Sequence, residues 1–216
     1  MLYLSILLCF VPLIAAAALC LGILKSLNIL TVLRSIFLGL AALIPVVLLQ
    51  LAARAFPVFH SGQLPAILLT ALLFNGIIEE SIKMSAVSAL PVKNAGLPEA
   101  AALGAILGLA FGCFEAVAYL IAGQQNILLR LCTAGVIHMV CTLLSSLSVW
   151  TWKQGQNRPA PFIYAVLVHG VYDFFARFSG GFWWFSIAAI CFGAIECRVW
   201  YQKLIPQRPA SERSEG

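Results

Sequence analysis

Apolar stretches of about twenty residues follow one another along almost the whole chain, separated by short polar or proline-containing breaks. Roughly 20 apolar residues at 1.5 Å rise per residue cross the hydrocarbon core of a bilayer as a helix. The pattern therefore predicts an all-α fold, a polytopic transmembrane helix bundle of about seven spanning helices. We place these helices at residues 2–24, 28–53, 64–91, 97–122, 127–152, 160–177 and 181–203.

The breaks support these boundaries. Pro65, Pro98 and Pro161 stand near predicted helix starts, where the missing backbone N–H of proline does no harm. The final segment, PQRPASERSEG, is polar and contains two prolines, which is typical of disordered chain. We therefore expect one membrane-embedded domain over residues 1–205 and a disordered cytoplasmic tail over 206–216.

Composition agrees with the hydropathy pattern and excludes several classes. Of the 216 residues, 62% are hydrophobic and only 10% are charged, unlike a soluble domain. The net charge of +5 comes from Lys and Arg in short loops and the tail, without interleaved aromatic residues. This distribution indicates membrane topology and no nucleic acid partner. The seven cysteines lie in apolar segments without a CxxC pair, so we interpret them as small buried hydrophobic residues.

The basic residues also predict orientation. The loops after the second, fourth and sixth helices offer only Arg54 and Arg177 near their edges. The loops after the first, third and fifth helices, with the tail, hold the excess: Lys25, Lys93, Lys153, Arg158, Lys203, Arg208 and Arg213. Cytoplasmic loops carry such an excess. We therefore expect an integral protein of the bacterial inner membrane, with its N-terminus outside and its C-terminus cytoplasmic, provided that seven helices span.

Small residues recur every four positions along the predicted helix at 97–122. They are Ala100, Gly104, Gly108, Gly112 and Ala116. Such a stripe lets a neighbouring helix approach closely, so that van der Waals contact holds the pair together in lipid. The stripe predicts close helix packing, with a groove lined by backbone as the alternative.

The predicted helix at 64–91 carries charges at membrane depth, in the stretch FNGIIEESIKM. One charge at a helix centre costs about 2.5–3.5 kcal/mol on insertion scales. Asn75, Glu79 and Lys83 share one helix face, and Glu80 can reach Lys83 three residues later. Two acids against one base leave one acid unmatched, which indicates a functional role beyond charge neutralisation.

The next three helices also carry polar or ionisable side chains at this depth, whereas the first, second and seventh contribute almost none. In chain order they are Glu115 and Tyr119, then Arg130 and His138, then His169 and Asp173. Each has a structural explanation alone, such as a satisfied His–Asp pair or a snorkelling arginine. Their concentration in four consecutive helices predicts one shared polar cavity and a catalytic core formed by the third to sixth helices.

These motifs resemble those of a known family. EESIK resembles the EExxK motif of PrsW-type intramembrane proteases, distant relatives of the CAAX-processing protease and bacteriocin-processing superfamily. FGCFEAVAYL resembles that family's FGxxENxxY motif, RLCTAGVIHMVCT its R…HxxxT segment and HGVYDFF its HGxYDF segment. Order and spacing agree over about residues 74–175. Ala116 departs from the pattern, because the family often has Asn there.

The resemblance implies an intramembrane endopeptidase that cuts membrane-anchored proteins, such as anti-sigma factors, within or near their membrane segment. Peptide hydrolysis needs an activated water, an oxyanion stabiliser and a proton donor. The catalytic candidates are Glu79, Glu80, Glu115, His138 and His169, with Asn75, Lys83, Tyr119, Arg130 and Asp173 in supporting roles. We favour Glu79 as the general base, because it shares its helix face with Asn75 and Lys83.

Metal dependence stays open at this point. Glu115, His138 and His169 could provide the three ligands of a catalytic zinc with one open position. The chain has no HExxH motif. The family is usually described as metalloproteases, while the wider superfamily suggests a metal-free, glutamate-activated water. We favour metal-independent chemistry, with zinc as the alternative.

Two other classes of function fit intramembrane Glu, His and Asp residues. One is a proton-coupled transporter or channel, in which such residues form a relay. The chain shows no inverted repeat and no pair of broken helices in corresponding positions, which disfavours a transporter. The other is a non-catalytic membrane scaffold with a relict site.

Overall fold

The computed structural model describes residues 2–53, 55–56, 62–123 and 126–205, and every regular element within these ranges is helical. The first half of the chain forms α1 (Leu2–Ile23), α2 (Ile29–Ala53), α3 (Leu64–Thr70), the π-helical stretch η2 (Ala71–Glu79), α4 (Glu80–Ser88) and α5 (Leu97–Ile121). The second half forms α6 (Ile127–Arg130), the π-helical stretch η3 (Leu131–Gly135), α7 (Val136–Lys153), α8 (Ala160–Ala176), the 3-10 turn η4 (Gly180–Trp183) and α9 (Trp184–Leu204).

These elements confirm the polytopic helical bundle. Six helical segments are long and apolar enough to cross a membrane: 2–23, 29–53, 64–88, 97–121, 128–153 and 180–204. The apolar helix α8 is shorter, at 17 residues, which is the lower limit for crossing a bilayer. The tail expected at 206–216 lies outside the described residues.

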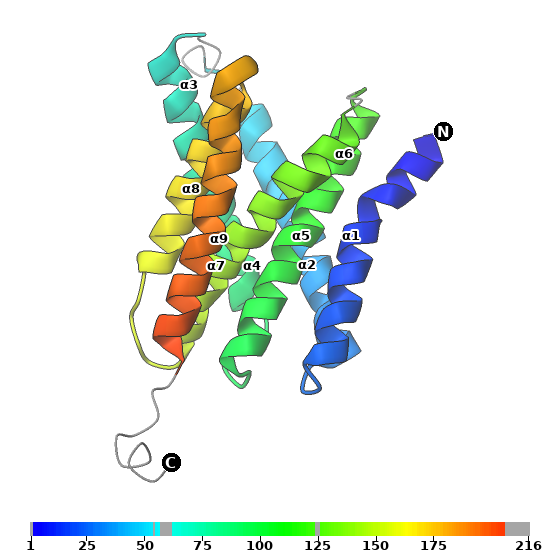
Figure 1. Ribbon diagram of the computed structural model, residues 1–216, viewed down its shortest axis with the longest axis vertical. Coiled ribbons are helices and arrows are strands. Elements are labelled where there is room, and N and C mark those ends of the chain that lie inside the picture. The colour runs from blue at the N-terminus through cyan, green and yellow to red at the C-terminus, as the bar shows by residue number, and fades with distance from the viewer. Residues whose placement is uncertain (1, 54, 57–61, 124–125, 206–216) are drawn as a thin grey trace.

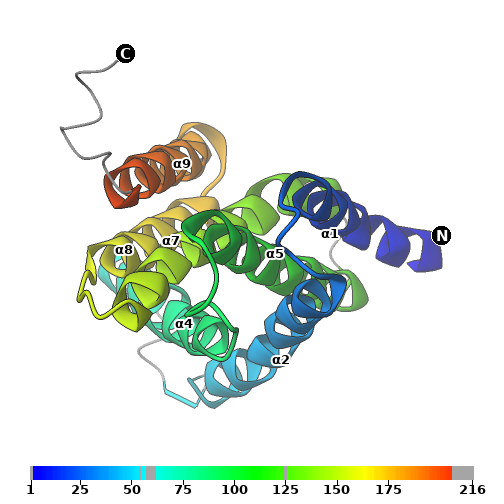
Figure 2. The same ribbon diagram turned by 90° about the horizontal axis from the view of Figure 1, so that it is seen from below.

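The bundle is arranged around α5 and α7, which run side by side through its middle (Figures 1 and 2). On one side α2 and α1 pack against α5, and on the other α8 and α9 pack against α7. The start of α1 and the end of α9 lie at opposite ends of the bundle in Figure 1. This placement agrees with an odd number of membrane crossings, and α8 is then one of them.

Two π-helical stretches depart from the regular helices that the sequence predicts. The first, η2, ends at Glu79 and packs against α8, and the second, η3, ends three residues before His138 and packs against α5. A π-helical turn bonds residue i to i+5, so it holds one residue more than an α-turn and changes the rotation of the next helical turns about the axis. The first stretch thus contains Glu79 of the polar cluster, and the second lies within one turn of His138.

The small-residue stripe on α5 faces α7, which confirms the packing prediction. A Cβ on Gly108 would overlap the backbone carbonyl oxygen of His138. A Cβ on Gly112 would lie 2.9 Å from the Cα of Gly135, closer than real Cβ contacts. The glycines therefore bring the α7 backbone against α5, and with it the side chain of His138 close to that of Glu115.

We expect the change Gly108→Ala to destabilise the protein, because the new methyl group has no room beside the His138 carbonyl. Overpacking of this kind costs about 1–3 kcal/mol. Thermal unfolding in detergent should show the loss. The control is Gly22→Ala on α1, where a Cβ meets nothing within 4 Å. Equal unfolding temperatures for both variants would contradict close packing of α5 on α7.

Candidate active site

The cluster is built around a lysine that is completely shielded from solvent. Lys83, on α4, is 0% exposed, and its Nζ lies 2.6 Å from Glu80 Oε1 and 3.7 Å from Glu79 Oε2. The same ammonium lies 4.7 Å from the centre of the Phe111 ring. The sequence pairing of one base with two acids is therefore present, and the shorter contact is to Glu80.

Glu80 is held by partners on three helices. Besides Lys83 on its own helix, its carboxylate accepts hydrogen bonds from His169 Nδ1 on α8 at 2.7 Å and from Ser145 Oγ on α7 at 3.4 Å. Glu80 is 0% exposed and is not among the described residues that line the adjacent cavity. Glu80 therefore lies in the interior of the bundle, behind the residues that line the cavity.

His138 has a defined tautomer. Its Nδ1 lies 3.1 Å from Lys83 Nζ, and its Nε2 lies 3.2 Å from Glu115 Oε2. An ammonium group can only donate, so Nδ1 accepts, and Nε2 carries the hydrogen that it donates to the Glu115 carboxylate. The two neighbours thus fix Nδ1 as the acceptor nitrogen of His138 and Nε2 as its donor nitrogen.

His169 lies between two carboxylates. Its Nδ1 pairs with Glu80 as described, and its Nε2 lies 3.2 Å from Asp173 Oδ2 one turn later on α8. When both carboxylates are ionised they can only accept hydrogen bonds, so the His169 ring donates from both of its nitrogens. The rings of His138 and His169 meet edge to face, with centroids 4.9 Å apart.

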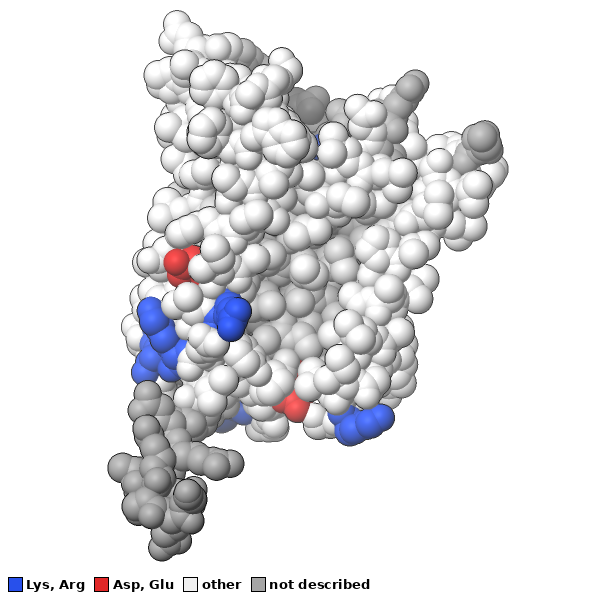
Figure 3. All heavy atoms as spheres, viewed as in Figure 1, with Lys and Arg blue, Asp and Glu red and all other residues white. Residues whose placement is uncertain are grey.

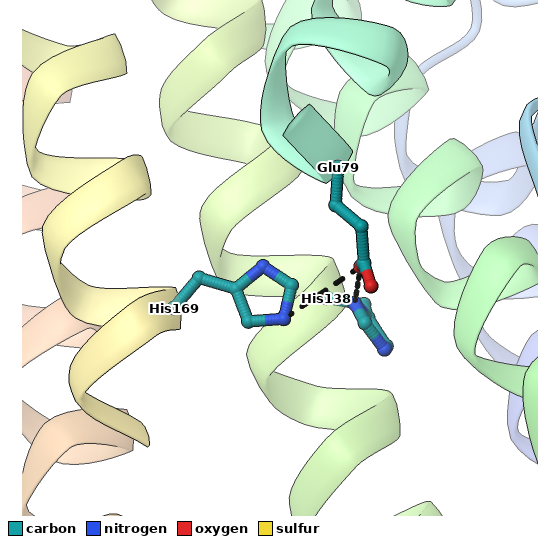
Figure 4. Close-up of side chains that lie close together, drawn as sticks. All are labelled: Glu79, His138 and His169. Atoms are coloured by element: carbon teal, nitrogen blue, oxygen red, sulfur yellow. Dashed lines mark ion pairs between the residues drawn. The ribbon is translucent and has the colours of Figure 1, made fainter. Parts of the chain in front are cut away.

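Glu79 points one oxygen at both histidines (Figure 4). Its Oε2 lies 3.9 Å from His138 Nδ1 and 3.8 Å from His169 Nε2. This atom is buried and has no hydrogen-bond partner among the described residues, while Oε1 accepts a hydrogen bond from Gln50 Nε2 at 3.0 Å. A buried acceptor left unsatisfied costs about 1–3 kcal/mol or more. Glu79 Oε2 is therefore a buried acceptor of the cluster that a ligand or a water could satisfy.

Glu115 is held from two sides. Its Oε2 accepts from His138 and lies 3.1 Å from Arg130 Nη2. The Arg130 guanidinium stacks on the Tyr119 ring, with its central carbon 3.6 Å from the ring centre. Arg130 thus links the start of the α6–α7 segment to α5.

A cavity of about 650 Å³ opens onto this cluster. Its walls come from α2, α3, η2, α5, the α6–η3–α7 segment and α8, and Ala53 and Gly62 place its rim at the end of the bundle where α2 ends and α3 begins. The polar side chains that line it are Gln50, Thr70, Asn75, Glu79, Glu115, Tyr119, Arg130, His138, Tyr172, Asp173 and Arg177. The structure therefore brings the ten predicted site residues together, at the cavity or directly behind it.

Gln50, Ser145 and Tyr172 were not predicted from the sequence. The expectation that the second helix contributes almost nothing concerned its centre, and α2 supplies Gln50 from its last turn to both Glu79 and the cavity. An amide near a helix end does not stand out among ionisable groups at membrane depth. The available signal was a single polar side chain in the apolar run VVLLQLAA.

Three atoms of the cluster form a candidate metal site. Glu79 Oε2, one nitrogen of His138 and one of His169 lie within 4.8 Å of one another, and all three residues are buried. Two imidazoles and a glutamate are a donor set found in catalytic zinc sites. From the sequence we expected Glu115 as the carboxylate ligand. In the structure Glu115 pairs with Nε2 of His138, on the far side of the ring from Glu79.

Comparison with known families decides the identity. The model of a family described as PrsW family intramembrane metalloprotease matches residues 28–195. The chain belongs to the PrsW family. It is an intramembrane endopeptidase, and the transporter, channel and scaffold alternatives are not favoured. Searches of curated proteins and of solved structures gave no match.

The charge balance of this PrsW protease leaves room for a cation. Four carboxylates pair with one ammonium and one guanidinium group, and the Arg177 guanidinium also lines the cavity, so the cluster holds more acids than cations. The four carboxylates, the ammonium and the first guanidinium belong to Glu79, Glu80, Glu115, Asp173, Lys83 and Arg130. Protonated imidazoles, a proton on a carboxylate or a bound cation can each offset the excess.

We expect Lys83→Met to lower the stability of the PrsW protease. The change removes a buried cation from two carboxylates, and breaking a buried pair costs about 3–5 kcal/mol. The yield of folded protein in detergent and its unfolding temperature should both fall. The control is Lys93→Met, which removes an exposed lysine from the loop before α5. Unchanged stability in Lys83→Met would show that the cluster does not need this charge.

Proposed function

We propose that this protein hydrolyses a peptide bond of a membrane-anchored substrate in the cavity beside η2, with Glu79 Oε2 as the reacting oxygen of the site. One observation carries the proposal: this buried oxygen faces two imidazoles and the cavity, and has no hydrogen-bond partner among the described residues. The resemblance of the motifs adds the class of substrate, a regulator such as an anti-sigma factor.

A zinc-bound form is supported by the donor set and by the groups that stand behind it. Glu79 Oε2, His138 Nδ1 and His169 Nε2 would hold the ion. Glu115 accepts from the far nitrogen of His138, and Glu80 from that of His169. Metal-binding histidines almost always have such a partner on the second nitrogen. When bound, zinc supplies a Lewis acid and makes a bound water more acidic.

In this form the chain's own residues would hold the two imidazole rings and orient the substrate. Glu80 and Glu115 would keep both rings in position, and Lys83 would keep its contact with Glu80 but would have to give up its contact with His138 Nδ1. Asp173, which lines the cavity, would likewise give up His169 Nε2. Arg130, which also lines the cavity, carries the positive charge that can orient a substrate carbonyl there.

A metal-free form, which the sequence favours, is supported by a different observation. His138 Nδ1 already accepts from Lys83, and His169 Nε2 already pairs with Asp173. Glu79 Oε2 would then act as general base: it takes one proton from water as the water oxygen attacks the carbonyl carbon. The same proton passes to the leaving amine as the C–N bond breaks. A doubly protonated His169 would stabilise the oxyanion.

We expect Glu79→Gln to abolish cleavage while the protein stays folded in the membrane. The amide neither takes a proton from water nor serves as a carboxylate ligand, and loss of a general base costs about 10²–10⁴-fold in rate. Proteomics of cells with the wild type or the variant should reveal a membrane protein that accumulates uncut in the variant.

The control for this comparison is Glu196→Gln on α9, which removes a carboxylate outside the cluster and should cut normally. If Glu79→Gln processes the same proteins as the wild type at equal protein level, the assignment of Glu79 is wrong. Uniform loss of protein in the Glu79 variant alone would mean that the residue is structural.

Metal content separates the two forms of the mechanism. If zinc is held as proposed, protein purified without chelator contains about one zinc per chain by elemental analysis. His138→Gln and His169→Gln should each lose it, while their folded yields stay measurable. Zinc-free wild type that still cuts its substrate would establish the metal-free form.

We propose that the N-terminus lies outside and the C-terminus in the cytoplasm of the bacterial inner membrane. Figure 3 shows Lys and Arg gathered at the lower end of the bundle, where α9 ends. A reporter that is active only in the cytoplasm should be active when it is fused after residue 216. A periplasmic signal there would reverse the orientation and put the rim of the cavity on the cytoplasmic side.

A further inference from the structure

Gln50 is an isolated polar side chain with a specific contact. It is the only polar side chain on α2 between Ser35 and Ala53, and the neighbouring Leu49 is exposed on the bundle surface. The half-buried Gln50 turns instead into the cavity, where its Nε2 donates to Glu79 Oε1 at 3.0 Å. A buried amide in an apolar helix is costly without a hydrogen-bond partner, and the partner of Gln50 is the Glu79 carboxylate.

This contact distinguishes two otherwise equivalent oxygens. The terminal torsion of a glutamate is broad and roughly two-fold, so packing alone does not fix which oxygen points where. A carboxylate only accepts, so the amide nitrogen of Gln50 is the atom that faces it. By occupying Oε1, Gln50 leaves Oε2 toward the nitrogens of His138 and His169.

A competing contact makes this restraint necessary. Lys83 Nζ lies 3.7 Å from Glu79 Oε2, just beyond hydrogen-bond distance, and attracts the carboxylate toward the buried side of the cluster. Gln50 reaches Glu79 from a different helix, α2. Without it, the Glu79 carboxylate is free to rotate toward Lys83, and Oε2 is no longer held at its distances from His138 Nδ1 and His169 Nε2.

We propose that Gln50 is a positioning residue of the active site: it holds the Glu79 carboxylate so that Oε2 stays available to the reaction. The inference rests on the proposed function of Glu79, and it applies to both forms of the mechanism. Gln50 acts through Glu79 and takes no part in bond making or breaking.

The test compares Gln50→Met, which keeps the length of the side chain but removes the donor, with the control Leu49→Met on the exposed face of the same helix. The first readout is zinc affinity of purified protein, measured by competition with a chromogenic chelator. The second is cleavage of the membrane protein that wild-type cells cut. Thermal unfolding of each variant reports on folding.

We expect Gln50→Met to weaken zinc binding or lower kcat by roughly 10- to 100-fold, the usual effect of removing a partner behind a ligand. KM and the unfolding temperature should change little, because Gln50 orients Glu79 rather than binding substrate. In a Glu79→Gln background the same change should have no further effect on zinc affinity. A merely structural link between α2 and η2 would lower the unfolding temperature in both backgrounds and leave kcat alone.

Each outcome is decisive. If the wild type cuts or binds zinc and Gln50→Met matches it, the role of Gln50 is refuted and the proposed function stands. If the wild type does neither, the proposed function fails and the role of Gln50 fails with it. If Gln50→Met does not fold, Gln50→Leu replaces it: this variant keeps much of the side-chain volume, removes the donor to Oε1 and should lose the same activity.

Discussion

The structure depends on keeping a lysine ammonium buried inside a membrane-spanning bundle. Lys83 is inaccessible to solvent, and such a charge is tolerated only with close partners. Glu80 supplies one at 2.6 Å, and His138 supplies a neutral acceptor at 3.1 Å. This arrangement connects α4 with α7, and Glu80 extends it to α8 through His169. The polar network therefore holds together the helices that carry the site.

Helix packing makes these short contacts possible. The glycines of α5 let α7 approach until His138 meets Glu115, although the two residues lie 23 positions apart. η2 ends at Glu79 and α4 begins at Glu80, and successive residues of a helix point about 100° apart, so Glu79 lines the cavity while Glu80 is buried behind it. Two adjacent carboxylates thereby acquire different surroundings.

That difference distinguishes the acids that are hydrogen-bonded to a histidine from the acid that keeps one oxygen without a hydrogen bond. Glu80 and Glu115 have their hydrogen-bonding capacity directed at the far nitrogens of His169 and His138. Glu79 has one oxygen bonded to Gln50 and one facing the histidines and the cavity. An orphaned carboxylate oxygen between two imidazoles suits either a cation or an activated water, which is why both forms of the mechanism use the same atom.

The sequence by itself determined the bundle, the helix ranges to within a few residues, and the charged and histidine residues of the polar cluster, because hydropathy and the cost of intramembrane charge are local properties. It favoured Glu79 over Glu80 through helical spacing. Only the tertiary structure showed that Glu79, rather than Glu115, joins the two histidines, since that depends on which ring nitrogen faces which helix. The contact of Gln50 with Glu79 was also visible only in the tertiary structure, because the two residues lie on different helices that folding brings together.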